Sequence, residues 1–182
     1  MADLGSITWP PVPIGTERLV LRESEARDRG ALIELFTSEQ VRAYLGGPRS
    51  RDELERTMPD MPGRRPGFFV VDLNGEMIGI VTLDPRGVDR PGHVCPEADE
   101  IELSYMFLPQ AWRRGYAAEA CITALEWFAT MFPGEPVVLC TQTANTPSMR
   151  LAAKLGFTEV DRFIEHGAEQ WFGMWSQDAT AG

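Results

Sequence analysis

Apolar and polar residues alternate along several segments of the chain, and along others apolar residues recur at helical spacing. Alternation places successive side chains on opposite faces of a strand, whereas helical spacing gathers apolar side chains on one side of a helix. The predicted strands are residues 18–23, 68–73, 77–83, 101–107, 136–141, 157–165 and 168–175. The predicted helices are residues 26–37, 38–45, 50–58, 115–132 and 146–155. This order of elements predicts an α+β fold with one central sheet.

Turn and cap residues separate these segments. The pair Asn74-Gly75 between two alternating runs is the strongest hairpin signal in the chain. Thr146 is the predicted N-cap of the helix that follows it, with Pro147 at the first helical position and Gly156 as the left-handed stop. The stretch 84–98, which is rich in proline and glycine, is predicted to be a long loop that overhangs a cleft.

Residues 101–124 run from a strand through a short turn into a helix. The first N–H groups of a helix have no intrahelical acceptors, and the helix dipole adds partial positive charge there. Gly115 and Ala117 allow a ligand to approach the backbone closely, and Arg113 and Arg114 add two full charges. These residues predict a phosphate cradle, although an ordinary turn with a solvated basic rim fits the same pattern.

Length and charge narrow the class of protein. At 182 residues the chain is long enough to bury a core as one domain, and 43% of its residues are hydrophobic. Its 27 acidic residues exceed its 17 basic residues, which gives a formal net charge of −10. This charge argues against nucleic acid as a partner, because phosphate backbones bind basic surfaces. It is compatible with a cationic substrate.

Cys95, Cys121 and Cys140 are odd in number and widely spaced, so they form neither a C-x-x-C metal pattern nor a disulfide framework. No bound metal is expected. No apolar run approaches the roughly 20 residues of a membrane span, and no signal peptide opens the chain. We therefore expect a cytoplasmic protein without a membrane partner. Residues 1–15 are expected to form a flexible leader, and residues 176–182 a polar tail.

The sequence of the predicted cradle, WRRGYAAEA, resembles the acyl-CoA pyrophosphate loop of the GNAT superfamily. Gly115 and Ala117 match the last two positions of its pattern, whereas Trp112 stands where glutamine or arginine is usual. The form W-x-x-G-Y-A-x-E-A after an E-x-x-Y strand is similar to the ribosomal-protein N-terminal acetyltransferase branch. The residues that fit this form are Glu102, Tyr105, Trp112, Gly115, Tyr116, Ala117, Glu119 and Ala120.

A second motif resembles the same superfamily. Its form is N-x-x-S-x-R-x-x-x-K-x-G-F, carried by Asn145, Ser148, Arg150, Lys154, Gly156 and Phe157. Together the two similarities identify residues 16–175 as a single GNAT acetyltransferase domain. The resemblance implies the acyl-CoA N-acyltransferase fold, in which helices flank one mostly antiparallel sheet whose two central strands splay apart.

The resemblance also implies acetyl-CoA, bound between the splayed strands, as the donor cosubstrate. Its pantetheine arm is expected to pair with the backbone of Met106, Phe107 and Leu108 like an added strand. Its pyrophosphate is expected on the backbone of Arg113, Arg114, Gly115, Tyr116, Ala117 and Ala118. Asn145 is expected to bond the pantetheine amide, although a cap role fits it equally, and Arg150 of the same motif joins the set of expected CoA-binding residues.

The implied reaction is direct attack of an amine on the thioester carbonyl, without a covalent acyl-enzyme. An ammonium has no lone pair, so a base must remove a proton. Glu102 is the expected base, since strand alternation turns it away from the apolar face and an apolar setting would raise its pKa; Glu100 and His93 are alternatives. Many GNAT enzymes protonate the leaving thiolate with a helix tyrosine, but Ala152 stands there, so Ser148 is the expected substitute.

The predicted function is an acetyl-CoA-dependent N-acetyltransferase acting on a primary amine. The acceptor is a protein or peptide N-terminus, or a small-molecule amine such as an aminoglycoside-like antibiotic. A larger acyl-CoA donor is an alternative. The missing tyrosine also leaves open a non-catalytic acyl-CoA-binding sensor or scaffold. A homodimer is compatible with the resemblance, because dimers are common in this superfamily.

Overall fold

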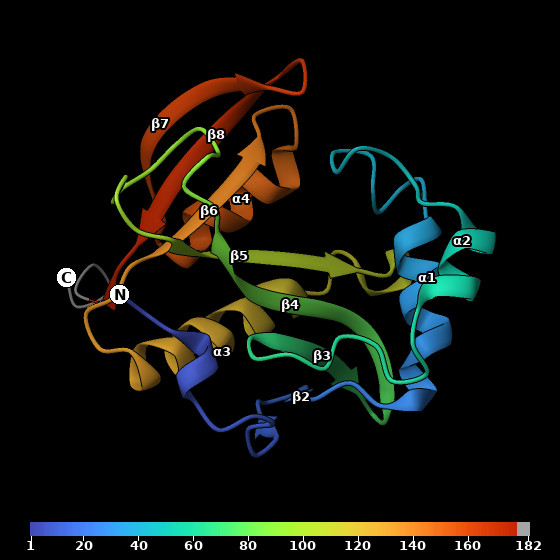
Figure 1. Ribbon diagram of the computed structural model, residues 1–182. Coiled ribbons are helices and arrows are strands. Elements are labelled where there is room, and N and C mark those ends of the chain that lie inside the picture. Colours follow the sequence, from blue (N-terminus) through green and yellow to red (C-terminus); the bar gives the residue numbers. More distant parts are fainter. Residues whose placement is uncertain (178–182) are drawn as a thin grey trace.

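The computed structural model describes residues 1–177 as a mixed sheet with helices on both faces (Figure 1). The strands are β1 (Ile14–Gly15), β2 (Val20–Arg22), β3 (Phe68–Leu73), β4 (Glu76–Arg86), β5 (Glu100–Phe107), β6 (Val137–Gln142), β7 (Thr158–Glu165) and β8 (Ala168–Trp175). The α-helices are α1 (Arg29–Thr37), α2 (Arg51–Thr57), α3 (Tyr116–Met131) and α4 (Thr146–Leu155). Short 3-10 helices are η1 (Leu4–Ser6), η2 (Ala26–Asp28) and η3 (Pro109–Ala111). The α+β prediction is confirmed.

The strands lie in the order β1-β2-β3-β4-β5-β6-β8-β7. Neighbouring strands are antiparallel except β5 and β6, which are parallel. Both faces of the central strands are covered. Phe69 and Val71 of β3 join a core cluster with α3, while Phe68 and Val70 join a second cluster with α1. The period of two in the sequence therefore divides one strand between two cores.

Residues 38–45, predicted to be helical, form consecutive turns instead. The guanidinium of Arg42 closes this segment, donating from Nε to Gly47 O at 2.6 Å and from Nη2 to Leu45 O at 2.7 Å. These carbonyls are therefore bonded to a side chain rather than to the backbone of a following turn. The helical spacing of the apolar residues was real, but the glycines that follow it do not support a helix.

The start of α4 also differs by one residue from the prediction. Asn145, not Thr146, is the N-cap, and its Oδ1 accepts a hydrogen bond from Ser148 N at 3.3 Å. Asparagine is among the strongest N-cap residues, so it displaces the neighbouring threonine. Gly156 ends the helix as predicted.

The predicted leader, residues 1–15, is packed against the domain rather than loose. Leu4 is buried, and the Trp9 ring meets the rings of Phe69 and Trp127 edge to face, with centroids 5.2 and 6.0 Å apart. The prolines of this segment suit an extended chain, and its apolar side chains supply the area that holds it on the sheet. The predicted tail lies mostly outside the described residues.

The two parallel strands in the middle of the sheet pair over a very short distance. Only Ile101 with Val137 and Glu102 with Val138 are in register, and beyond them β5 and β6 diverge (Figure 1). On its other side β5 stays paired with β4 as far as Phe107. The result is an open wedge between β5 and β6, which agrees with the predicted splay.

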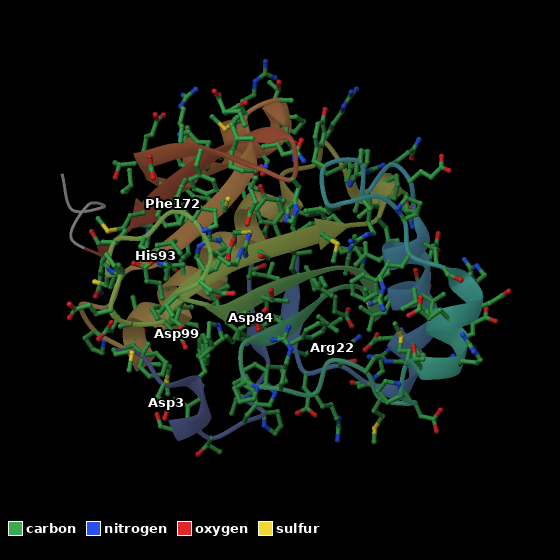
Figure 2. The ribbon with its side chains drawn as sticks, turned by 45° about the horizontal axis from the view of Figure 1, so that its top comes forward. Asp3, Arg22, Asp84, His93, Asp99 and Phe172 are labelled. Carbon is green, nitrogen blue, oxygen red and sulfur yellow. The ribbon has the colours of Figure 1, made fainter. Side chains whose placement is uncertain are left out.

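A buried ion cluster joins β2 to β3 and η2. Arg22, labelled in Figure 2, donates from Nη1 and Nη2 to the two carboxylate oxygens of Asp28 at 2.8 and 2.9 Å. Its Nε donates to Asp72 Oδ2 at 2.8 Å. Burial pushes the pKa of Asp28 upwards, but the bonds from Arg22 and from Glu25 N outweigh this and hold that pKa below its usual value.

Replacement of Asp28 by alanine is expected to lower the free energy of unfolding by about 3–5 kcal/mol, because it leaves the buried Arg22 with one partner fewer. Since the folded-state pKa of Asp28 lies below the unfolded one, its contribution is complete at neutral pH and is lost as the pH falls through that lowered value. Urea denaturation at neutral and acidic pH should therefore show a difference that shrinks with acid. The half-exposed Glu25, changed to Gln, serves as the control and should alter stability little. Equal stability of Asp28→Ala and the unmodified protein at neutral pH would refute the role of the cluster.

Candidate active site

The turn between η3 and α3 exposes a run of unused backbone donors. Arg113 and Gly115 both have left-handed backbones, with φ of 60° and 78°. Alternating left- and right-handed residues curve a chain so that successive N–H groups converge, which forms an anion-binding concavity. Within residues 1–177, no N–H group of residues 113–118 donates a hydrogen bond. We call these residues the 113–118 turn; its free donors and the dipole of α3 suit a phosphate group.

Trp112 fixes this turn to the end of β5. Its indole Nε1 donates to Phe107 O at 2.8 Å, while the residue as a whole remains 42% exposed. Trp112, which departs from the usual superfamily pattern, therefore anchors the turn to β5. This structural role is compatible with an anion site that is built from backbone N–H groups. Arg113 and Arg114 are exposed at the rim of the turn, as the sequence predicted.

The backbone edge of β5 that faces the wedge is open. Leu108 donates its N–H to Ile78 O of β4 at 2.9 Å, and its carbonyl accepts from Ala111 N at 2.9 Å. Because backbone groups alternate in direction along a strand, those of Phe107 point away from β4. Its carbonyl accepts from Trp112 Nε1, so its N–H is the group left for a ligand within residues 1–177. Of the three residues expected to pair with pantetheine, Leu108 thus has both groups engaged elsewhere. The side chain of Met106 packs on the α1 side of the sheet.

Tyr105 and Ser148 meet beneath the wedge. The Tyr105 hydroxyl on β5 and the Ser148 hydroxyl on α4 are in hydrogen-bond contact, and either oxygen is able to donate. Burial raises the pKa of Tyr105 above its usual value, although the bond to Ser148 opposes this, so the phenol stays neutral. The alternation of β5 turns Tyr105 towards the apolar core on the α3 side, where it would be read as a packing residue. The E-x-x-Y pattern was the one signal for it.

The remaining residues of the second motif lie at the start of α4. The Oδ1 atom of Asn145 is occupied by the cap, and its side-chain nitrogen has no partner within residues 1–177. Arg150 is exposed and forms no ion pair in the described part of the chain. Both side chains are therefore available to a ligand.

The surroundings of Glu102 differ from the apolar setting that the sequence suggested. Its Oε2 accepts hydrogen bonds from Arg86 Nη1 at 2.9 Å and from Arg90 Nη1 at 3.2 Å. Arg90 also donates from Nη2 to Glu165 Oε2 at 3.2 Å. Strand alternation correctly turned Glu102 away from the α3 face. The arginines come from the end of β4 and the following loop, which alternation within β5 does not reveal.

The loop of residues 87–99 lies against β7 and β8. Arg86 is fully buried and donates to the carbonyls of Pro91 and Gly92, while its guanidinium stacks 5.1 Å from the Phe172 ring. A Cβ on Gly92 would lie 2.4 Å from Phe163, so the loop approaches these strands as closely as glycine allows. Figure 2 labels His93 on this loop and Phe172 on the strand that it covers.

Glu100 and His93, the two alternative general bases, lie where this loop joins β5. Glu100 Oε1 accepts from the backbone N–H groups of Val94 and Cys95. This carboxylate oxygen therefore anchors the loop. His93 Nδ1 lies 3.7 Å from Glu100 Oε2, and neither imidazole nitrogen has a hydrogen-bond partner within residues 1–177. The structure thus brings these two residues together and separates their surroundings from those of Ser148.

Comparison with known proteins decides the family. The model of the family described as Acetyltransferase (GNAT) domain matches residues 18–158. The chain belongs to the GNAT acetyltransferase family. It is similar to the uncharacterized N-acetyltransferase YnaD of Bacillus subtilis (strain 168), with 26% identity over 164 residues that cover 87% of this chain and 91% of the relative.

Solved structures of GNAT proteins share the fold. An acetyltransferase (GNAT family) from Bacillus anthracis superposes with a TM-score of 0.73 at 22% identity, covering 92% of this chain and 99% of the other. Spermidine N-acetyltransferase from Vibrio cholerae, crystallised with CoA and spermine, superposes with a TM-score of 0.70 at 20% identity, covering 92% and 100%. The protein is accordingly a GNAT-family N-acetyltransferase. None of the helices in residues 1–177 has the length and apolar character to cross a membrane.

Cys140 is the thiol of β6 on the side of Glu102, yet it is poorly suited to act as a nucleophile in this GNAT enzyme. Burial raises its pKa to about 11; by smaller amounts, Arg86 lowers this pKa and Glu102 raises it. Its Sγ contacts Gln170 Oε1 at 3.9 Å. A thiol with this pKa is almost wholly protonated at neutral pH, which disfavours a covalent acyl-cysteine.

Proposed function

We propose that this GNAT enzyme transfers an acetyl group from acetyl-CoA directly to a primary amine within a ternary complex. The observation that carries the proposal is the run of unpaired N–H groups in the 113–118 turn, placed directly beyond the open edge of β5. A diphosphate joined to an amide-containing arm matches that sequence of donors. The CoA complex of the Vibrio cholerae enzyme with the same fold supports this donor.

The proposed donor site runs along the wedge. The pantetheine arm lies along the edge of β5 that has no strand partner, and the free amide nitrogen of Asn145 approaches it from α4. The pyrophosphate accepts from the 113–118 turn, with Arg113 and Arg114 as exposed counter-charges. Arg150, which is exposed and unpaired within residues 1–177, supplies a further cation on the α4 side. In this arrangement the thioester lies beside Phe107, at the open end of the wedge.

The proposed base is Glu102, because it lies on the opposite face of β5 from α3 and at the closed end of the wedge. Its bonds to Arg86 and Arg90 hold the carboxylate in one position. Glu102 lies five residues before Phe107 on β5, roughly 16 Å along the strand, so the amine loses its proton to Glu102 through bridging waters as nitrogen attacks the acetyl carbonyl. The negative charge that develops on the carbonyl oxygen is stabilised by the N–H of Phe107, which the alternation of β5 directs into the wedge.

The proposed acid is Ser148, oriented by Tyr105. The C–S bond breaks as the tetrahedral intermediate collapses, and the thiolate of CoA takes a proton from the Ser148 hydroxyl. With its raised pKa, the Tyr105 phenol acts as a donor to Ser148 rather than as a source of charge. Together, Ser148 and Tyr105 take the place of the helix tyrosine acid, whose position is Ala152 in this chain.

We propose that the acceptor is a protein or peptide α-amine, the kind of substrate that the ribosomal-protein N-terminal acetyltransferase branch uses. Small polyamines are the second candidate. The sequence motifs favour the first. The net charge of −10 and the fold shared with a spermidine N-acetyltransferase favour the second. The proposal includes a cytoplasmic location and no nucleic-acid partner.

The expected result of a turnover assay is CoA release from acetyl-CoA with one acceptor class. The panel contains peptides with free N-termini, spermine, an aminoglycoside and a peptide with a blocked N-terminus. Mass spectrometry of the products identifies the acetylated nitrogen. Tight binding of acetyl-CoA without release of CoA for any acceptor would instead favour an acyl-CoA sensor, and turnover only with a larger acyl-CoA would change the donor.

Glu102→Gln is expected to lower kcat by about 100-fold or more while the KM for acetyl-CoA changes little, because a base contributes in the transition state. Glu165→Gln is the matched control, since it removes the other carboxylate of Arg90 without touching β5. Steady-state kinetics and thermal unfolding are measured on both. Unchanged kcat in Glu102→Gln would remove Glu102 from the mechanism, and equal losses in both variants would show that it only anchors the loop.

Ser148→Ala is expected to reduce kcat by about 100-fold, and Tyr105→Phe by about 10-fold, because the first removes the acid and the second only its orientation. Since Tyr105 acts through Ser148, the double variant should be no slower than Ser148→Ala alone. Tyr44→Phe, at an exposed tyrosine, is the control. Additive losses in the double variant would mean that the two hydroxyls act independently.

A further inference from the structure

The segment that leads into β2 is joined to the first turn of α3 by a compact set of hydrogen bonds. Glu119 Oε1 accepts from Thr16 Oγ1 at 2.6 Å and from Arg18 N at 2.9 Å. Glu119 Oε2 accepts from Arg18 Nε at 2.8 Å and pairs with Arg18 Nη2 at 2.6 Å. Each of the two carboxylate oxygens thus makes two polar contacts with the same short segment. We call Thr16, Arg18 and Glu119 the Arg18–Glu119 clamp.

Arg18 also contacts the 113–118 turn. Its Nη1 donates to Arg114 O at 2.9 Å, and its guanidinium lies 4.6 Å from the centroid of the Tyr116 ring. A Cβ built on Gly115, between these two residues, would lie 3.4 Å from Arg18 Nη2. One side chain therefore contacts the turn on both sides of its left-handed glycine.

The bond to Arg114 O has a geometric consequence for the donors of the turn. In a trans peptide the carbonyl and the following N–H point in opposite directions. Arg18 holds the Arg114 carbonyl on its own side, so the N–H of Gly115 is directed away from Arg18. The same bond turns the oxygen, which would repel an anion, away from the side of the free N–H. Orientation of donors before the ligand arrives lowers the entropic cost of binding.

The charge balance favours positioning over direct attraction. Arg18 is neutralised by Glu119, and three of its five N–H donors bond Glu119 and Arg114 O. Burial would raise the pKa of Glu119, but its bonds from Thr16 and Arg18 lower it, so the clamp remains ionised at neutral pH. A guanidinium so occupied contributes shape to the turn rather than a free positive charge.

We propose that Arg18 and Glu119 are positioning residues for the diphosphate of the acyl-CoA donor, acting through the backbone of the 113–118 turn. The inference rests on the proposed donor site. It assigns a joint role to the segment that opens the domain, which carries Arg18, and to the W-x-x-G-Y-A-x-E-A segment, which carries Glu119.

The test compares a donor that contains the diphosphate with one that lacks it. Calorimetric titration with CoA and kinetics with acetyl-CoA and S-acetylpantetheine are carried out on Arg18→Met, Arg18→Lys and Glu119→Gln. We expect the Kd for CoA and the KM for acetyl-CoA to rise about 10-fold in all three variants, with kcat retained. The kcat/KM for S-acetylpantetheine should stay within about twofold, because that donor does not reach the turn.

Arg18→Lys separates positioning from attraction. Lysine keeps the charge but cannot bond Glu119 and Arg114 O with one planar group. If Arg18 attracted the phosphates as a charge, Arg18→Lys would bind CoA as well as the unmodified protein, and the proposal would be overturned. Amide hydrogen exchange in the 113–118 turn, expected to be faster in each variant, reports the loss of order directly.

Arg162→Lys is the matched control, because Arg162 forms a similar two-point ion pair with Glu159 on β7, away from the turn. It should leave CoA binding unchanged. Equal weakening of CoA and S-acetylpantetheine in the clamp variants would reduce the clamp to a general structural role. Failure of the unmodified protein to bind CoA would overturn the proposed donor site as well, whereas normal binding in all variants would reject only the clamp.

Discussion

The separation of β5 from β6 is the constraint on which the rest of the molecule depends. After two residue pairs in register, the backbone of β5 has no strand partner on one side, and such groups are costly unless they find other partners, as Phe107 O does in Trp112 Nε1. The neighbouring strands hold the wedge open from outside, since β4 stays paired with β5 and β8 stays paired with β6. An unfilled strand position in the middle of a sheet is what an extended, amide-bearing ligand is able to occupy.

Much of this architecture is readable in the sequence because it depends on local periodicity. The alternation of β3 divides its side chains between two cores, and the hairpin at Asn74-Gly75 and the stop at Gly156 follow from backbone preferences of single residues. Residues 38–45 could not be predicted in this way. Their apolar spacing is helical, but the side chain of Arg42 bonds the carbonyls of its own segment, and helical periodicity does not report such bonds.

The candidate site shows the same division. The 113–118 turn could be predicted because its donors belong to a continuous stretch with a glycine at its centre. The partners of Glu102 could not, since Arg86 and Arg90 lie 16 and 12 residues earlier in the chain and reach it only through the strand pairing and the loop. Tyr105 was hidden for a related reason: its ring satisfies the apolar pattern of β5, and only the fold shows that its hydroxyl meets α4.

The Arg18–Glu119 clamp joins residues 101 positions apart in the sequence. Contacts between residues so far apart in sequence form late in folding, because the entropic cost of closing a large loop comes before the contact stabilises the fold. During synthesis on the ribosome, Thr16 and Arg18 therefore emerge long before Glu119, the residue to which they bond. The donor turn can reach its final shape only once residues 16–18 are bonded to α3, so the ability to hold a donor marks a late stage of folding rather than an early one.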